Sequence, residues 1–339
     1  MSTPKTPTEI DLGTVFSGKR ALVTGGLGFI GSNLARRLVD LEADVTIVDS
    51  MVPGHGGNPF NIADFVEQVT VSGADLRDRK SMENLLKGQH FVFNLAGQVS
   101  HIDSMTDPLT DLDINCRAHL TFLEALRAVN PNAKVVFAGT RQQYGRPRYL
   151  PVDESHPMDP VDVNGINKAA AEGYHLLYYR VYGLRTVSLR LTNTYGPGLL
   201  MKHPRQGFIA VFIRRALENQ TIQLYGGGKQ VRDLTYVDDV VAAFLMVAAS
   251  DATEGQAFNL GGIQPYPLYR IAEAIIEAAG HGRLESVEFP EDKKRIDIGD
   301  YYGSYELIRR TVGWKPKTSL EDGIRKTVDF YKRNMKYYI

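Results

Sequence analysis

Three glycines recur at intervals of three residues, Gly25, Gly28 and Gly31, directly after the apolar run Ala21–Thr24, and a helical pattern follows them. They therefore lie where a strand turns into a helix. Glycines at this spacing permit a tight turn, close approach of the backbone to a pyrophosphate, and close packing of helix on strand. The helix N-terminus adds N–H groups and a positive dipole. The spacing predicts a dinucleotide-binding turn.

An acidic residue ends the next predicted strand, because Asp49 stands 18 residues after Gly31. A carboxylate there can accept hydrogen bonds from both adenosine-ribose hydroxyls and repels a 2′-phosphate. Ser50 and the two residues after it include no arginine that could neutralise such a phosphate. We therefore predict NAD rather than NADP. The alternative, a glycine turn with an incidental strand-end acid, leaves the complete strand–turn–helix–strand order unexplained.

Two later strand ends suit the same ligand. Asp75 and Leu76 follow the third predicted strand, where an acid can meet the adenine amino group. Leu95, Ala96 and Gly97 close the fourth strand with small residues that leave room beside the backbone, although each position also fits ordinary loop chemistry. The predicted dinucleotide contacts are Gly25, Gly28, Phe29, Ile30, Gly31, Asp49, Ser50, Asp75, Leu76, Leu95, Ala96 and Gly97.

Composition excludes several other functions. Lys+Arg and Asp+Glu both total 39 in 339 residues, so there is no basic surplus to drive nucleic-acid binding. The single cysteine, Cys116, excludes an intrachain disulfide framework and a cysteine-rich zinc site, and we predict no metal. The N-terminus lacks the apolar stretch of a secretory signal, and no run of about 18 apolar residues could span a membrane. We expect a cytoplasmic protein.

Short β-branched runs alternate with longer helical patterns through the first 190 residues. This alternation predicts an α/β fold, a doubly wound parallel sheet with helices on both faces, and a smaller C-terminal substrate-binding lobe. We expect a polar tail over residues 1–18, the dinucleotide-binding domain over 19–192, and mainly the substrate lobe over 193–339, with some segments returning to the first domain. The predicted strands are 21–24, 45–49, 69–72, 91–95, 134–138 and 186–190, and the helices of the first domain are 30–41, 80–86, 111–129 and 167–182.

The motifs resemble those of the extended short-chain dehydrogenase/reductase family, specifically its NAD-dependent nucleotide-sugar epimerases and dehydratases. The resemblance extends from Lys19 to Tyr331. It implies a Rossmann-type fold, bound NAD, and a reaction in which the cofactor takes a hydride from a sugar carbon and leaves a transient ketone. The motifs are Gly25-x-x-Gly28-x-x-Gly31, Ala96-Gly97, Thr140-x-x-x-Tyr144-Gly145, Lys168, Tyr195-Gly196-Pro197, Arg232-Asp233-x-x-Tyr236-Val237-Asp238-Asp239 and Gly313-Trp314-x-Pro316.

The family's proton-transfer residues are only partly present. Thr140 matches its Ser/Thr, and Lys168 matches its lysine, which also binds the nicotinamide ribose, but Asn164 stands where the tyrosine base is expected. A carboxamide has no titratable proton near neutrality, so Asn164 can only orient a hydroxyl or a water. Lys168 with a lowered pKa, acting directly or through a water, is one replacement base. His101 is another, although a loop histidine is often structural. The candidate catalytic residues are thus Thr140, Asn164, Lys168 and His101.

The residues after Thr140 separate the reactions of the family. Its sugar dehydratases carry an Asp-Glu pair there, whereas this chain has Arg141-Gln142, and Gln142 cannot be the acid that helps to expel water. Epimerisation needs the fewest groups. The resemblance therefore implies a nucleotide-sugar epimerase similar to the UDP-glucose 4-epimerases. The alternatives are a non-catalytic nucleotide-sugar and NAD-binding homologue, and a dehydratase or CDP-sugar 2-epimerase.

The resemblance also implies a nucleotide-diphosphate sugar as substrate. Arg232 and Arg295 match arginines that clamp the diphosphate, for which charge-assisted hydrogen bonds are strong. The helices 111–129 and 167–182 are where this family builds its homodimer interface, although their apolar faces also suit packing on the sheet. The predicted substrate-binding residues are Asn193, Gln206, Tyr225, Arg232 and Arg295.

Overall fold

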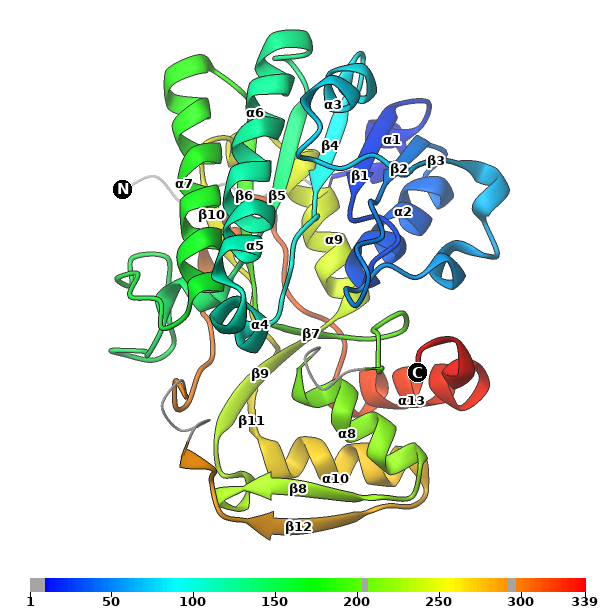
Figure 1. Ribbon diagram of the computed structural model, residues 1–339, viewed down its shortest axis with the longest axis vertical. Helices are drawn as coiled ribbons and strands as arrows, with labels where there is room; N and C mark the ends of the chain where they lie inside the picture. The colour runs from blue at the N-terminus through cyan, green and yellow to red at the C-terminus, as the bar shows by residue number, and fades with distance from the viewer. Residues whose placement is uncertain (1–9, 203–206, 292–296) are drawn as a thin grey trace.

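A seven-stranded sheet, parallel throughout, forms the centre of the molecule, with strand order β10-β6-β5-β4-β1-β2-β3 (Figure 1). The computed structural model describes residues 10–202, 207–291 and 297–339. Six of the strands are those predicted from the sequence. The seventh, β10, has only three residues and is too short to be recognised from its pattern. The strands are β1 (Arg20–Thr24), β2 (Asp44–Val48), β3 (Val69–Ser72), β4 (Phe91–Asn94), β5 (Lys134–Thr140), β6 (Thr186–Leu191) and β10 (Ala257–Asn259).

Helices cover both faces of this sheet (Figure 1). On one face, α2 (Phe29–Asp40) and α9 (Val237–Ala248) bury residues such as Leu34 and Phe244 in one apolar cluster. On the other, α3 (Arg79–Leu86), α6 (Ala118–Val129) and α7 (Val163–Tyr182) contribute to a second cluster. The predicted Rossmann-type, doubly wound α/β fold is confirmed.

The strand order places the ends of β1 and β4 side by side at the centre of the sheet. Thr24 and Asn94 are register partners, and the Thr24 Oγ1 atom donates to Asn94 Oδ1 over 2.9 Å. The sheet grows outward in opposite directions from this pair of strands, toward β3 and toward β10. In doubly wound sheets a crevice opens at such a reversal, outside the carboxyl ends of the strands.

A smaller lobe lies below the carboxyl ends of the central strands (Figure 1). It has a three-stranded sheet of order β11-β9-β7 and a parallel pair of β8 with β12. Because α9 and β10 pack with elements of the first domain, the two parts are continuous. The elements of this lobe and its C-terminal segment are β7 (Asn193–Tyr195), α8 (Phe208–Leu217), β8 (Thr221–Tyr225), β9 (Val231–Tyr236), β11 (Pro265–Pro267), α10 (Leu268–Ala279), β12 (Arg283–Val287), α12 (Glu306–Val312) and α13 (Leu320–Asn334).

Two segments differ from the sequence-based expectation. The predicted polar tail contains α1 (Leu12–Phe16), where Phe16 is fully buried and its ring lies 4.6 Å from that of Phe91. The helix predicted over 111–129 is three pieces: the end of α5 (Pro108–Leu112), a π-helical turn and α6. Neither the burial of one aromatic side chain nor a local change from α-helix to π-helix alters the hydrophobic periodicity of the sequence. The sequence therefore could not predict either feature.

Within the described ranges, no helix is both long enough and apolar enough to cross a bilayer.

Candidate functional site

The glycine turn after β1 has the geometry that the sequence predicts. Gly25 has φ +65, a conformation that favours glycine, and its N–H donates to Val48 O over 2.8 Å. A Cβ atom on Gly31 would lie 2.2 Å from Gly25 O, so only glycine lets α2 start this close to the strand. No side chain caps the helix at Gly28. The N-terminal amides of α2 therefore remain available to a pyrophosphate.

Asp49 both lines the crevice and closes the turn. Its Oδ2 accepts from the Leu27 N–H over 3.0 Å, and its Oδ1 accepts from the Met51 N–H over 2.9 Å. This double contact fixes the carboxylate beside the glycine turn, the place where an adenosine ribose is expected.

Asp75 forms an ion pair that the sequence analysis missed. The Arg77 guanidinium lies 2.7 Å from the Asp75 carboxylate and holds its pKa below the ordinary value. Arg77 lines the crevice too. An arginine two residues after an acid carries no distinctive signal in the sequence.

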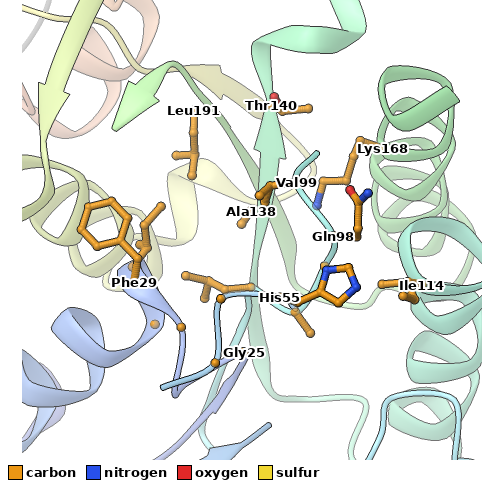
Figure 2. A pocket seen from close by; sticks show the side chains of 18 of the residues that line it. Gly25, Phe29, His55, Gln98, Val99, Ile114, Ala138, Thr140, Lys168 and Leu191 are labelled. Carbon is orange, nitrogen blue, oxygen red and sulfur yellow. The ribbon is translucent and has the colours of Figure 1, made fainter. Parts of the chain in front are cut away.

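One cavity of about 400 Å³ collects most of the predicted residues (Figure 2). All of the predicted cofactor contacts line it, and so do the catalytic candidates Thr140, Asn164, Lys168 and His101. In Figure 2, Lys168 reaches from its helix toward Ala138, and Thr140 stands at the end of the strand that carries Ala138. The glycine turn leaves a space that a Cβ atom would fill, Asp49 offers an acid for the ribose, and Lys168 lies deeper in the cavity. Together these features fit NAD.

Lys168 is a buried residue of the cavity wall. Burial lowers the pKa of its ammonium to about 8, even though the Asp111 and Glu172 carboxylates act in the opposite direction. The Nζ atom lies 4.4 Å from the centre of the Phe137 ring, a favourable contact for a cation.

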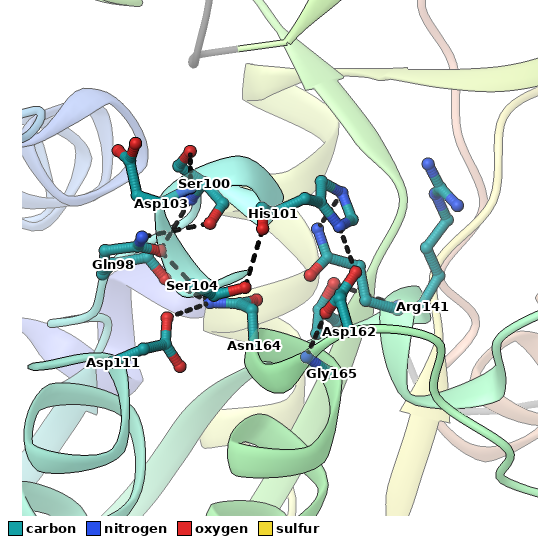
Figure 3. Close-up of polar contacts among 12 residues, drawn as sticks. Gln98, Ser100, His101, Asp103, Ser104, Asp111, Arg141, Asp162, Asn164 and Gly165 are labelled. Carbon is teal, nitrogen blue, oxygen red and sulfur yellow. Dashed lines mark hydrogen bonds and ion pairs between the residues drawn. The ribbon is translucent and has the colours of Figure 1, made fainter. Parts of the chain in front are cut away.

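Asn164 is committed to neighbouring protein groups. Its Nδ2 donates to Gln98 O over 2.9 Å and to Asp111 Oδ2 over 3.1 Å, and the residue is 2% exposed. Asp111 also accepts from the amides of Asn115 and Asn167. Figure 3 shows the Asn164 amide pointing toward Gln98 and Asp111, away from the His101 ring.

His101 takes part in a hydrogen-bonded chain that the sequence analysis did not identify. Its Nδ1 atom pairs with Asp162 Oδ2 (Figure 3). Its Nε2 atom lies 2.6 Å from Gln142 Nε2. Asp162 is the N-cap of α7, where its Oδ1 accepts from the Gly165 N–H over 2.7 Å. An aspartate before a helix is a recognisable cap signal, but nothing in the sequence pairs it with a histidine 61 residues away.

The predicted substrate-binding residues are only partly brought to this cavity. Asn193 lines it, and its Nδ2 donates to Asp233 O over 3.1 Å. Arg232 is buried outside the cavity lining, where it donates to Val231 O and Gly299 O. Tyr225, also outside the lining, has its ring 5.5 Å from that of Phe289. Gln206 and Arg295 lie outside the described residues.

Arg141 is a further cavity residue that the sequence analysis did not assign to the site. Its guanidinium lies over the Tyr301 ring, 4.9 Å from the ring centre, and reaches Asn193 Oδ1 at 3.5 Å. Burial, and to a lesser degree the charge of Arg141, lowers the pKa of Arg232 to about 10. Of these two arginines only Arg141 lines the cavity, and it places a positive charge next to Asn193.

Known proteins share this architecture. The model of the NAD-dependent epimerase/dehydratase family matches residues 21–261. A UDP-glucose 4-epimerase of Mycolicibacterium smegmatis is 31% identical over 317 residues, which cover 92% of this chain and 98% of that protein.

Two solved structures extend the comparison. The UDP-N-acetylglucosamine 4-epimerase of Methanobrevibacter ruminantium M1, in complex with UDP-N-acetylmuramic acid, superposes with TM-score 0.86 at 29% identity, covering 94% of this chain and all of that one (100%). The UDP-glucose 4-epimerase of Thermus thermophilus, in complex with NAD, superposes with TM-score 0.81 at 31% identity, covering 93% and 99%. The chain belongs to the NAD-dependent epimerase/dehydratase family.

Proposed function

We propose that this chain is an NAD-dependent nucleotide-sugar epimerase, similar to UDP-glucose 4-epimerase, with an atypical active site. The observation that carries the proposal is the convergence of the glycine turn, Thr140 and Lys168 on one cavity, with Gln142 in place of an acid. The names of the M. smegmatis, M. ruminantium and T. thermophilus relatives support the same reaction class.

The cofactor would be held by residues spread along the cavity. The amides of the glycine turn would bind the pyrophosphate, Asp49 would bind the adenosine ribose, and Lys168 would bind the nicotinamide ribose. When bound, NAD+ supplies a reversible hydride acceptor for one carbon of the sugar. The sugar becomes a keto intermediate, turns in the site, and regains the hydride on its other face.

The chain's own residues then have to orient a hydroxyl and move its proton. Thr140 lies at the end of β5 and can hydrogen-bond the reacting hydroxyl. Asn164 cannot act as the base, since a carboxamide does not titrate near neutrality and its N–H groups are engaged elsewhere. Gln142 offers no proton to a leaving hydroxyl, so loss of water is disfavoured and epimerisation is favoured.

Asn193 and Arg232 would bind the sugar-diphosphate half of the substrate from the smaller lobe. Asn193 lines the cavity, whereas the Arg232 guanidinium lies outside its lining, where Nη1 bonds the two carbonyls and Nη2 lies 3.7 Å from Asp297 Oδ1. Arg232 would have to exchange these contacts for the diphosphate. Gln206, Tyr225 and Arg295 complete the proposed set by their match to the family motifs.

We also propose a homodimer formed through α6 and α7. On α7, Leu177, Val181 and Tyr182 are exposed although they are apolar or aromatic, at 41%, 59% and 49%. Light scattering on the purified chain tests this, and a single-chain mass would overturn it.

The function is tested by incubating the protein and NAD with UDP-, GDP-, CDP- and dTDP-sugars and resolving the products by chromatography and mass. An isomer of unchanged mass is expected. A product lighter by one water would identify a dehydratase instead.

A second candidate function is a non-catalytic NAD- and nucleotide-sugar-binding protein. The observation that favours it is Asn164 at the position of the family tyrosine. Binding of a nucleotide sugar without any product, and without reduction of bound NAD, would support this candidate over the epimerase.

A further inference from the structure

We propose that His101 and Asp162 form the acid–base pair of this site, with His101 exchanging the proton of the sugar hydroxyl and Asp162 acting as its positioning residue. The proposal rests on the epimerase function proposed above. Its starting point is the hydrogen-bonded chain Asp162–His101–Gln142, of which His101 and Gln142 line the cavity. Figure 3 shows the contact of His101 with Asp162.

The hydrogen-bond partners assign the protons of the imidazole. A carboxylate only accepts, so the His101 Nδ1 atom carries the hydrogen shared with Asp162. The Nε2 partner is the amide nitrogen of Gln142, which only donates, so Nε2 presents a lone pair. In this assignment the imidazole carries its hydrogen at Nδ1, and Nε2 is directed away from Asp162 and toward Gln142.

Asp162 is placed to hold this tautomer and to remain ionised. Its side chain is 3% exposed, whereas that of His101 is 41% exposed. Burial alone raises the pKa of the Asp162 carboxyl, but the His101 hydrogen bond, the Gly165 N–H and the Arg141 charge outweigh it and lower that pKa. An anion fixed at Nδ1 stabilises the imidazolium that forms when Nε2 takes a proton.

Gln142 provides the second observation that points to a ligand. Its Oε1 atom is buried and has no hydrogen-bond partner within the described part of the chain. A sugar hydroxyl that displaces the Gln142 amide from Nε2 can donate its proton to His101. The freed carboxamide then has a neighbouring hydroxyl as a partner for Oε1.

The proton and electron balance is simple. His101 Nε2 takes the hydroxyl proton as the carbon–hydrogen bond of the same carbon breaks, and the hydride passes to NAD+, which is the oxidant. The hydroxyl oxygen becomes a ketone oxygen, and His101 becomes an imidazolium paired with Asp162. In the return step the same proton goes back to the oxygen as the hydride returns to the carbon.

Lys168, the other candidate base, is less suited to this role. The pKa of its ammonium, about 8, leaves it mostly protonated at neutral pH. Its Nζ lies against the Phe137 ring, where a cation is favoured. It acts as a positive group beside the cofactor.

The first experiment uses His101→Ala in the full chain with NAD and the sugar that the wild type converts. We expect kcat to fall by about 100-fold to 10,000-fold, with NAD content unchanged. Added imidazole should restore part of kcat, which a structural role would not allow. The matched control is His281→Ala, remote from the cavity, where His281 contacts the Ala216 carbonyl. Imidazole should leave its kcat unchanged.

The second experiment uses Asp162→Asn, because asparagine caps a helix as well as aspartate does. Its amide would donate to His101 Nδ1 and move the hydrogen to Nε2. We expect kcat to fall with little change in KM, and the ¹⁵N shifts of His101 to change from an Nδ1–H to an Nε2–H tautomer. The same substitution at a buried aspartate with a structural role alone would leave the tautomer unchanged.

The outcomes separate this pair from the function on which it rests. Conversion of a sugar by the wild type, with His101→Ala retaining kcat within about threefold, would overturn the pair and leave the epimerase standing. An Nε2–H tautomer in the wild type would overturn the hydrogen-bond assignment. Failure of the wild type to convert any of the sugars would overturn the proposed function and the acid–base role together.

Discussion

The Nδ2 atom of Asn164 donates to the main-chain carbonyl of Gln98 over 2.9 Å, and so joins the start of α7 to the loop that follows β4. The Asn164 amide, at the position where the sequence analysis expects a tyrosine base, thus holds the cavity wall. The same amide reaches the buried carboxylate of Asp111 at 3.1 Å. Asn164 therefore has a structural role in packed polar contacts.

Asn164→Ala should destabilise the fold by about 1–3 kcal/mol, because two buried acceptors lose a donor. Urea unfolding measures the change. Asn132→Ala, at an exposed position, is the control and should stay within about 0.5 kcal/mol of the wild type. Asn164→Tyr should also destabilise the protein, by overpacking, without raising turnover. A gain of turnover in Asn164→Tyr would contradict this account and favour the non-catalytic candidate.

Gly31→Ala should abolish tight NAD binding and destabilise the protein by about 1–3 kcal/mol, because the new Cβ would lie 2.2 Å from Gly25 O. Thermal unfolding with and without NAD measures both effects. Gly73→Ala adds the same methyl group to an exposed loop with nothing within 4 Å, and should behave like the wild type. Retention of NAD by Gly31→Ala would show that the turn can shift.

Asp49 should give the wild type a clear preference for NAD over NADP, which calorimetric titration can measure. In Asp49→Asn we expect NAD affinity to fall by about 10-fold or more, because hydrogen bonds to a charged acceptor are replaced by weaker ones. Loss of the charge should bring the two affinities closer together. Equal binding of NAD and NADP by the wild type would refute the assignment of Asp49 to the adenosine ribose.

Lys168→Met should stabilise the cofactor-free protein at pH 7, by up to about 3 kcal/mol, while weakening NAD binding. The native pKa of Lys168, about 8, lies below its ordinary value of 10.5, so the folded state disfavours the cation at neutral pH. As pH rises from about 8 toward 10.5, the native lysine is already neutral, and this cost disappears from the wild type.

The stability gap between Lys168→Met and the wild type should therefore shrink over that interval, as urea unfolding at several pH values would show. The exposed Lys315→Met is the matched control and should give a gap that does not change with pH. A constant gap for Lys168→Met would mean that the ammonium is well solvated.

The sequence by itself determined the fold class and the cofactor end of the site. The glycine triplet, the acid at the end of the second strand, and the alternation of short strands with helices are local patterns. Backbone sterics and hydrophobic periodicity restrict the segments that carry such patterns to one local conformation. Because parallel strands bring their carboxyl ends to one edge, Gly25, Asp49, Ala96 and Thr140 had to meet in one crevice.

The tertiary structure decided which contacts individual side chains make. Asn164 turns to Gln98, Arg232 bonds to carbonyl groups outside the cavity lining, and Phe16 of the predicted tail enters the core. His101 and Asp162, 61 residues apart, become partners only because α4 (His101–Thr106) packs beside the start of α7. Pairings of this kind depend on which distant segments share a packed interface, and no periodic pattern in the chain encodes them.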